Sequence, residues 1–435
     1  MGILYKDIYD DFVNKIITKE LKPNTKLPSK RALAIDLNVS LSTVVNAYEL
    51  LLDEGFIYSK YKSGYFVSNN IDFELKPTEH IKNETKENKI KYDFTTKNTI
   101  NPPSTTLIKI TKNILLDNSY LNKTEFQGDY SLRLAITEHL SLNRGIKVSP
   151  DNIFITSGIE SLRNVIRILD INNITLENPG YHKLAKMANN LGLKINYQDI
   201  DENGIKVPSY RTIIYSTTFN QFPTGIKMSL ERKNELVKFL KETNSYLIED
   251  DFDAEFRIKG SKTIPLFSIS DNVIFSSTFS EILYSGLRIS YFILPNKLKD
   301  IYIKHYDSYS TTVPTLDQLI LRDYINYGYY AKLINKTKND FIKKRNLISE
   351  ILDKNNIKYD KNKNYLSMLI NIDNKDENIL INNLKEKGIL IETINNYDIN
   401  KKSNKILILG YTALNIEDLE KGLKIIIEEL KNKRD

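Results

Sequence analysis

Cysteine is absent from this 435-residue chain, and histidine occurs only four times. Without cysteine the protein has no disulfide framework, no thiol nucleophile and no cysteine metal site. No two histidines stand at H-x-x-H spacing, so a histidine metal site is not expected. No apolar run approaches the length of a bilayer span, and the N-terminus, with Asp7 and Asp10, lacks the apolar core of a signal peptide. These absences predict a cytoplasmic protein with no membrane partner.

The composition is that of a globular protein, with 41% hydrophobic and 27% charged residues. Because the chain is too long for one ordinary domain, we expect a small domain joined to a large one, or two similar halves. No internal repeat is present. The formal net charge of +7 permits nucleic acid as a partner without demanding it, since both signs of charge are spread along the chain.

Residues 4–68 form one compact pattern of three helices and a hairpin. Apolar residues at helical spacing indicate the first helix: Tyr5, Ile8, Phe12, Ile16 and Ile17. The second helix starts at Pro28-Ser29, with Leu33 and Leu37 inward. After a short turn, Ser40 or Ser42 can cap the third helix. The inner face of that helix is expected to contain Val44, Tyr48, Leu51 and Leu52, and Gly55 ends it.

Two short strands follow around Lys62-Ser63-Gly64, so the whole pattern predicts a winged helix-turn-helix. In such a module the N-terminal part of the third helix enters the major groove of DNA. Hydroxyl, amide, aromatic and basic side chains on this surface can reach bases and phosphates. The candidates are Lys26, Lys30, Arg31, Ser40, Ser42, Thr43, Asn46, Lys60, Tyr61 and Lys62. The alternative is a module that makes protein contacts, with its lysines merely solvated.

The stretch LPSKRALAIDLNVSLSTVVNAYELLLDEGFIYSKYKSGYFVS resembles, without a break, the N-terminal domain of GntR-type regulators. The resemblance implies a double-stranded DNA operator as partner, contacted by Arg31, Ser42, Thr43 and the wing tip near Tyr61. The family often has arginines at the start of the third helix, whereas this chain has no basic residue from Leu41 to Leu52. We therefore expect less bidentate reading of guanine and a larger share of phosphate contact.

Residues 69–92 are polar and charge-mixed, which is typical of a linker. Beyond them, helical and strand patterns alternate, which favours an α/β domain with a mostly parallel central sheet. The expected buried strands are Ile153–Thr156, Ile174–Glu177, Thr212–Tyr215, Ser245–Glu249 and Val273–Ser276, and a further α+β segment runs from about residue 330 to the end. We thus predict a winged helix-turn-helix at 1–68, a linker at 69–92 and a large α/β domain at 93–435.

Five short motifs follow one another in the large domain. The first, TSGIE at 156–160, is a strand, a small-residue turn and a helix start, whose N–H groups can hold a phosphate. LENPGY, FNQFPTG, LIEDDFDAEFR and SSTFSEILYSGLRISY come next. In this order and spacing they resemble the fold-type I aminotransferases, whose cofactor is pyridoxal phosphate. A GntR-type winged helix joined to such a domain is the layout of the MocR-type regulators.

The resemblance implies a role for each matching residue in a cofactor or ligand site. These are a phosphate cradle at Ser157, Gly158 and Ile159, anion contacts from Thr278 and Arg288, a stacking ring at Tyr181 and a carboxylate for the pyridine nitrogen at Asp250. Taken alone, an arginine such as Arg288 more commonly forms an ordinary ion pair, whereas the surrounding motifs favour the anion site.

Three positions depart from the family's pattern. Glu281 stands where the lysine forms the Schiff base, and a carboxylate cannot form an imine. Phe252 stands where a tyrosine hydroxyl meets the ring oxygen, and Ile408 where an arginine often binds a substrate carboxylate. We therefore expect a degenerate domain that is not an enzyme and holds no cofactor covalently.

Non-covalent pyridoxamine phosphate would suit such a site, with its phosphate on Arg288 and its amine toward Glu281. The alternative is that no cofactor binds and Glu281 pairs with a nearby basic residue. The resemblance further implies a head-to-tail homodimer, in which a small-molecule effector would change the distance between two DNA-reading heads. Two other functions remain open: an active aminotransferase-like regulator that uses another lysine, and a constitutive DNA-binding dimer that needs no ligand.

Overall fold

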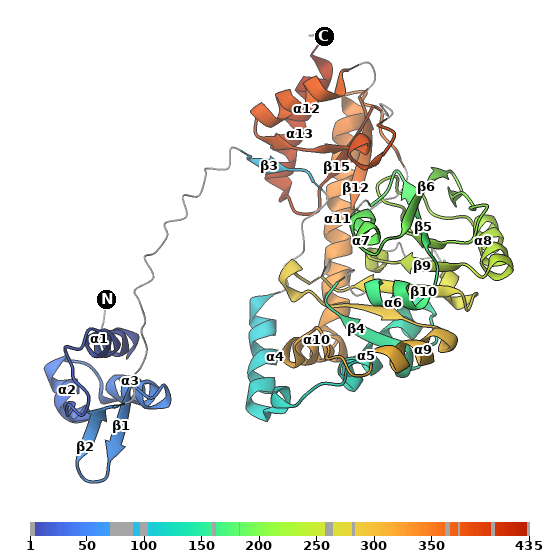
Figure 1. Ribbon diagram of the computed structural model, residues 1–435. Helices are drawn as coiled ribbons and strands as arrows, with labels where there is room; N and C mark the ends of the chain where they lie inside the picture. The colour runs from blue at the N-terminus through green and yellow to red at the C-terminus, as the bar shows by residue number, and fades with distance from the viewer. Residues whose placement is uncertain are drawn as a thin grey trace. The chain divides into compact units, whose positions relative to one another are not determined.

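The computed structural model divides the chain into two compact units, Met1–Glu87 and Asn88–Asp435, whose elements are labelled in Figure 1. The residues that it describes are 5–69, 90–95, 103–158, 162–181, 183–256, 264–280, 283–361, 366–372, 375–401 and 405–432. Among these residues, none of the helices combines the length and apolarity needed to cross a lipid bilayer.

The N-terminal unit consists of the three helices and the hairpin that the apolar pattern predicts. They are α1 (Tyr5–Ile17), α2 (Lys30–Asp36), α3 (Leu41–Asp53), β1 (Ile57–Lys60) and β2 (Gly64–Val67). The core contains most of the apolar residues expected on the inner helix faces: Ile8, Phe12, Ile16, Leu33, Val44, Tyr48 and Leu51. Leu37 and Leu52 pack against it half-buried, while Tyr5 is exposed. The strands pair antiparallel, so the unit is a winged helix-turn-helix.

Local caps decide where α2 and α3 begin. The Ser29 Oγ accepts the backbone N–H of Ala32 at 3.1 Å, and the Ser40 Oγ accepts that of Thr43 at 3.1 Å. Of the two caps considered for α3, the structure therefore uses Ser40. The Tyr48 hydroxyl donates to the carbonyl oxygen of Pro28 at 2.8 Å, which ties α3 to the start of α2.

The large unit is organised around an eight-stranded sheet with the order β4-β11-β10-β9-β8-β5-β6-β7. Its strands are β4 (Ile153–Thr156), β5 (Asn173–Asn178), β6 (Lys194–Asp201), β7 (Gly204–Ile205), β8 (Ile213–Ser216), β9 (Tyr246–Asp250), β10 (Val273–Thr278) and β11 (Ser290–Ile293). The five strands expected from buried apolar runs are all present. Neighbouring strands from β10 through β9, β8 and β5 to β6 pair in parallel, and β11 is antiparallel to both β10 and β4.

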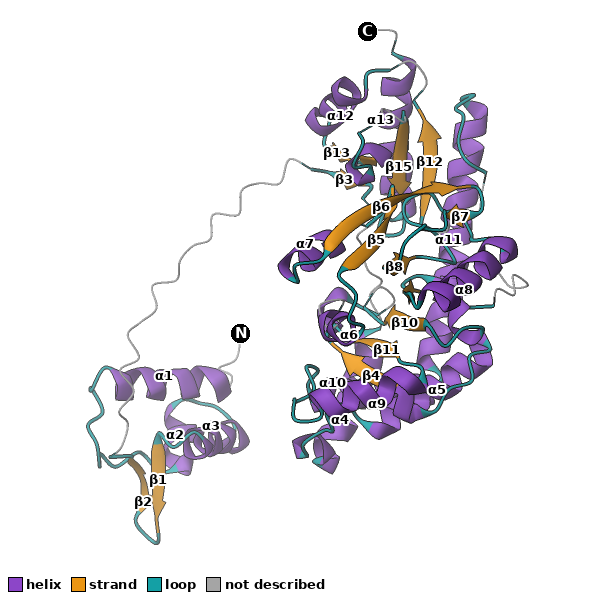
Figure 2. Ribbon diagram, turned by 45° about the vertical axis from the view of Figure 1, so that its right-hand side comes forward, coloured by secondary structure: helices purple, strands orange, loops and turns teal. Residues whose placement is uncertain are grey.

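Both faces of this sheet are covered, as Figure 2 shows. The covering helices are α4 (Ser104–Asp117), α5 (Tyr130–Arg144), α6 (Leu162–Ile168), α7 (Lys183–Asn190), α8 (Leu230–Thr243), α9 (Asn296–Tyr306), α10 (Thr315–Asn326) and α11 (Tyr329–Lys354). Successive residues of one strand point to opposite faces, so Phe154 packs with α6, α7 and α9 while Ile153 and Ile155 pack with α4, α5, α10 and α11. Helix α8 covers the sheet beside Ile214 and Leu247. Burial on both faces explains why these strands are continuous apolar runs.

The C-terminal part of the large unit is the expected α+β segment. It contains β12 (Ser367–Asn371), β13 (Ile389–Leu390), β14 (Glu392–Thr393), β15 (Ile406–Gly410), α12 (Glu377–Glu386) and α13 (Ile416–Lys431). The short strand β3 (Tyr92–Asp93) pairs in parallel with β13, so the large unit already includes Tyr92. Phe94, which follows, is fully buried because Gly410 and Gly422 have no side chain where its backbone and ring lie.

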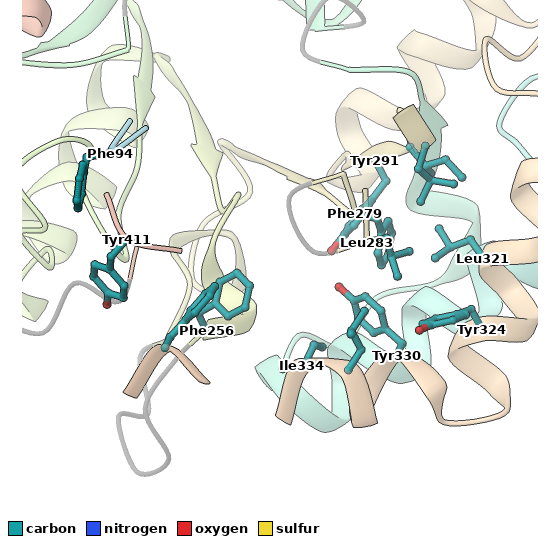
Figure 3. Packing of buried hydrophobic residues seen from close by; sticks show 14 of the residues in the cluster. Phe94, Phe256, Phe279, Leu283, Tyr291, Leu321, Tyr324, Tyr330, Ile334 and Tyr411 are labelled. Carbon is teal, nitrogen blue, oxygen red and sulfur yellow. The ribbon is translucent and has the colours of Figure 1, made fainter. Parts of the chain in front are cut away.

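Short 3-10 turns complete the described elements. They are η1 (Ser119–Leu121), η2 (Pro150–Asn152), η4 (Ala254–Phe256), η5 (Leu266–Ser268), η6 (Ser285–Leu287) and η7 (Ile394–Tyr397). The segment after β10 is anchored by an aromatic cluster, in which the Phe279 ring lies 5.5 Å from the rings of both Tyr291 and Tyr330 (Figure 3). This buried ring holds Thr278 and Ser280 in place on either side of it.

Candidate nucleic-acid interface and ligand site

One face of α3 remains open to solvent at the helix start. Val44, Ala47 and Tyr48 are fully buried, whereas Ser42 and Asn46, one helical turn apart, are exposed. Leu41 is also exposed, to 44%. The residues on this face are those that a helix inserted in a groove would offer to base edges.

The hydroxyls at the start of α3 form a cluster. The Ser40 Oγ lies 2.8 Å from the Ser42 Oγ and 2.7 Å from the Thr43 Oγ1, in addition to capping the helix. Thr43 is half-buried, while Ser40 and Ser42 are exposed. The predicted contact residues Ser40, Ser42 and Thr43 therefore lie together, with the hydroxyl oxygen of Ser40 engaged in the structure of the helix itself.

The predicted basic contacts lie at the start of α2 and on the hairpin. Lys30 is half-buried, with its Nζ 4.9 Å from the centre of the Tyr65 ring on β2, whereas Arg31 beside it is exposed. At the hairpin tip Tyr61 is 87% exposed, and the Nζ of Lys62 lies 5.3 Å from its ring centre. Lys26 and Lys60 are exposed. The hairpin thus presents an aromatic ring and ammonium groups to solvent.

In the large unit, the predicted ligand residues come together at one edge of the sheet. β4, β5, β8, β9 and β10 run in the same direction, so the segments that follow them meet at their carboxyl ends. Because β11 runs the other way, Arg288 just before it lies at the same edge, and Thr156, Ser290 and Thr278 stand side by side in register. This carboxyl edge therefore contains Ser157, Gly158, Tyr181, Asp250, Thr278 and Arg288. Ile159 and Glu281 lie outside the described residues.

The anion-binding candidates are held by backbone and hydroxyl contacts. The Ser157 N–H donates to the Thr312 Oγ1 at 3.1 Å. The Thr278 Oγ1 accepts the hydroxyl of Ser290 at 3.0 Å and lies 3.3 Å from the carbonyl oxygen of Ile289. Arg288 is exposed, with a left-handed backbone at φ 49°.

Asp250 and Tyr181 lie in different surroundings. The hydroxyl of Tyr215, at the end of β8, donates to the Asp250 carboxylate. Burial raises the pKa of Tyr215 well above its usual value, and the charge of Asp250 raises it further. Tyr181 is 37% exposed, and the Nζ of Lys183 lies 5.7 Å from its ring centre. A phenol-bonded carboxylate and an accessible ring thus face this edge of the sheet.

Buried carboxylates that the sequence motifs did not indicate lie near the ends of the same strands: Glu177 in β5, Glu249 in β9 and Asp253 just after β9. Glu177 accepts hydrogen bonds from Ser216, Thr217 and Gln221, and Glu249 accepts them from Thr218 and two backbone N–H groups. Burial raises the pKa of Glu177 to about 7, against the lowering effect of its donors. Burial likewise raises the pKa of Asp253 to about 7, although a hydrogen bond from Asn220 opposes this change.

Helix α5 clamps the segment after β9 with two ion pairs. Arg144 lies 2.5 Å from Asp251, with both side chains at most 4% exposed, and His139 lies 2.6 Å from Glu255. Burial alone would raise the pKa of Glu255, but the His139 charge and hydrogen bond lower it to about 2. The only sequence signal of these partners was the cluster of acids in EDDFDAEF. The basic partners stand more than a hundred residues earlier.

Both units are similar to known protein families. The profile of bacterial regulatory proteins of the gntR family matches residues 4–67, and that of class I and II aminotransferases matches residues 89–424. The uncharacterized HTH-type transcriptional regulator YdeL of Bacillus subtilis is 30% identical to this chain, over 97% of this chain and 95% of its own length. The probable rhizopine catabolism regulatory protein MocR of Rhizobium meliloti is 24% identical, over 77% and 74%.

This chain is a MocR-type regulator of the GntR family. It is a DNA-binding transcription regulator with an aminotransferase-like domain. The HTH-type pyridoxine biosynthesis transcriptional regulator PdxR of Corynebacterium glutamicum is 26% identical, over 87% of this chain and 85% of its own. An archaeal alanine:glyoxylate aminotransferase superposes with a TM-score of 0.68 at 21% identity, covering 77% of this chain and 88% of that one. At this identity the likeness establishes the fold-type I architecture of the MocR-type regulator's large unit.

Proposed function

We propose that this MocR-type regulator binds its operator through α3 and the β1–β2 hairpin, while its aminotransferase-like domain does not catalyse transamination. The observation that carries the second part is the glutamate at position 281, where the family's pattern has the imine-forming lysine. Transamination needs that lysine twice, as imine partner and as the base that moves a proton. A carboxylate supplies no amine for the first role.

The donor set at the carboxyl edge does not fit a covalently held pyridoxal phosphate. Phe252 is half-buried and has no hydroxyl to offer the cofactor's ring oxygen. Ile408 is 1% exposed in the middle of β15, where an apolar side chain suits the core. These observations support a domain that has kept the fold of an aminotransferase while losing its chemistry.

A phosphorylated amine held without a covalent bond remains the ligand that suits the site. Arg288 is exposed at the carboxyl edge and supplies a charge-assisted donor for phosphate. Glu281 would face the ligand's ammonium group, with opposite charges attracting. Such a ligand, pyridoxamine phosphate or a similar compound, would act by binding one dimer arrangement more tightly than another.

A homodimer is supported by the apolar surface of α4. Ile108, Leu115 and Leu116 of this helix are 65%, 43% and 74% exposed, and Leu121 just beyond it is 69% exposed. Apolar side chains gathered on one helix mark a surface that a partner covers. A second copy arranged head to tail would also bring two winged helices to two half-sites of one operator.

Absorbance of the purified protein tests whether the cofactor is bound as an imine, which transamination requires. The purified full-length chain is mixed with pyridoxal phosphate and treated with borohydride, which fixes an imine onto the protein. We expect no imine band that saturates at one cofactor per chain and no pyridoxyl group at residue 281, because that position has no amine. Peptide mapping separates a specific site from weak labelling of exposed lysines. The variant Glu281→Lys should gain both, since it restores the amine to an otherwise similar fold.

Lys183 provides the matched control, since its ammonium lies against the Tyr181 ring. One pyridoxyl group per wild-type chain, fixed on a single lysine, would overturn the proposal. If this pyridoxyl group were absent from Lys183→Ala, Lys183 would be the lysine that holds the cofactor. The protein would then be interpreted as an active aminotransferase-like regulator that uses another lysine.

DNA binding is tested by fluorescence anisotropy with duplex from the chain's own promoter, with and without pyridoxamine phosphate. Specific binding that changes with the ligand supports the sensing domain. Specific binding that ignores it supports the constitutive dimer instead. Failure to bind any promoter duplex at low salt would refute the operator-binding part of the proposal.

A further inference from the structure

We propose that the start of α3 selects A·T base pairs, with Leu41 against a thymine methyl group and Asn46 paired to an adenine edge. The inference rests on the proposed function only in requiring that α3 lie in the major groove. It names the bases read by that helix, which neither the fold nor the family relationship specifies.

The first two turns of α3 present few kinds of chemistry. Ser42 and Asn46 are exposed one turn apart, and Leu41 is 44% exposed with Val45 half-buried one turn behind it. Leu41 belongs to no part of the buried core of the unit. An amide, the hydroxyls of Ser42 and half-buried Thr43, and two branched apolar side chains are therefore what this face offers to a groove.

The amide and the apolar side chains fit an A·T pair better than a G·C pair. In the major groove only thymine carries a methyl group, which apolar side chains contact, and an asparagine amide pairs in bidentate fashion with adenine N6 and N7. Guanine is normally read by arginine or lysine, and α3 contains neither. Serine accepts either pair. The recognition face thus lacks the reader of guanine and has both readers of A·T.

Acidic residues confine the contact to the helix start. Glu49 and Asp53 are exposed further along α3, where they would repel phosphates. A glutamate could accept from cytosine N4, but Glu49 lies two turns from the helix start, beyond the N-terminal residues that reach base edges in such modules. Residues 41–46 therefore carry the base contacts.

The charge of the unit makes these contacts more important. Residues 1–68 contain nine lysines and arginines against eight aspartates and glutamates, so non-specific attraction to DNA is modest. Four of the nine basic residues lie at the start of α2 and at the hairpin tip: Lys30, Arg31, Lys60 and Lys62. A hairpin tip inserted in the minor groove would favour the same sequences as α3, because the narrow minor groove of A-tracts has an enhanced negative potential that attracts basic side chains.

The experiment starts from selection with the full-length chain on duplexes randomised over the length of one operator, followed by anisotropy on the winning site. Each thymine is then replaced by deoxyuridine, which removes the methyl group, and each adenine by 2′-deoxynebularine, which removes the N6 amino group. We expect one thymine per half-site where deoxyuridine weakens binding about fourfold. At one adenine, nebularine should weaken binding about tenfold.

Side-chain variants assign these losses to residues. In Leu41→Ala the deoxyuridine effect should vanish, and in Leu41→Met, which keeps an apolar contact, it should persist. In Asn46→Ala the nebularine effect should vanish while the deoxyuridine effect remains. Ile35→Ala is the matched control, because Ile35 is an exposed apolar residue on α2 and its removal should leave both effects intact.

The outcomes separate this inference from the proposed function. Selected sites with G·C pairs under α3, or base-analogue effects that survive Leu41→Ala and Asn46→Ala, would overturn the A·T assignment while DNA binding stands. No selection of any duplex at low salt would overturn both. Loss of the two effects in their respective variants, with Ile35→Ala unchanged, establishes the assignment.

Discussion

The two units of this regulator use their polar side chains in opposite ways. At the start of α3, Ser42 and Asn46 face solvent on a helix whose apolar residues fill the core. At the carboxyl edge of the large unit, Glu177 and Glu249 are buried and each accepts several hydrogen bonds from the protein itself. A surface that must recognise a partner keeps its polar groups exposed, whereas buried polar groups must be satisfied internally.

This contrast predicts that single polar substitutions cost stability in one unit and affinity in the other. The largest effect is expected for Arg144→Met, which leaves Asp251 buried without its arginine. Breaking such a pair typically costs about 3–5 kcal/mol, because the remaining charge has lost its partner. Urea unfolding of the full-length chain should show this loss in the transition of the large unit.

Arg31→Met is the control for that measurement, since Arg31 is exposed on α2. It should leave both unfolding transitions unchanged. A cost below about 1 kcal/mol for Arg144→Met would mean that the α5 clamp does not hold the segment after β9.

The next effect depends on pH. Because the pKa of Asp253 is raised from 3.8 to about 7 by burial, the folded protein binds this proton more tightly than the unfolded chain. The contribution of Asp253 to stability is therefore complete below pH 3.8 and is lost as the pH rises to about 7, by at most roughly 1.4 kcal/mol per pH unit. Asp253→Asn, which cannot ionise, should gain stability relative to the wild type across this range in chemical denaturation.

Glu255 has the opposite shift from Asp253, because its pKa is lowered from 4.5 to about 2. Its stabilising contribution is present above pH 4.5 and is lost as the pH falls through 2. Glu255→Gln should therefore be less stable than the wild type at neutral pH, with the difference shrinking in acid. The same pH trend in both variants would contradict the assignment of opposite shifts.

A smaller effect distinguishes two neighbouring serines of the DNA-reading unit. Ser40→Ala removes the cap of α3 and should destabilise this unit by about 1 kcal/mol in thermal unfolding. Ser42→Ala removes an exposed hydroxyl, so it should leave the melting temperature unchanged and weaken operator binding in anisotropy. Equal melting temperatures for the two variants would show that the cap contributes nothing.

Lys62→Ala, at the exposed hairpin tip, is expected to leave the stability of the protein unchanged. Its consequence should appear in the salt dependence of DNA binding, since each lost phosphate contact reduces the slope of log affinity against log salt by about 1. The loss should be nearly uniform across DNA sequences. A variant that changed sequence preference and kept the wild-type slope would place Lys62 on a base.

Most elements could be predicted because their signals are local. The five buried strands and three N-terminal helices follow from apolar spacing within each segment, and Ser40 or Ser42 was expected to cap α3 from the residue types alone. The choice of Ser40 needed the backbone geometry of the turn, since both serines stand at the helix start. Contacts between distant segments had no such signal. The Ser157–Thr312 bond joins residues far apart in the chain, and nothing near Ser157 identifies its partner.

Local apolar patterns and residue types are enough to predict the order of the elements and the winged helix-turn-helix, and they show that Phe252 and Glu281 replace the family's residues. The burial of the carboxylates, the ion pair of Asp251 with Arg144 and the hydrogen bond from Tyr215 to Asp250 become visible once the chain is folded. The physical reason is that burial and pairing depend on strands and helices brought together from distant parts of the chain, where the sheet order sets the neighbours.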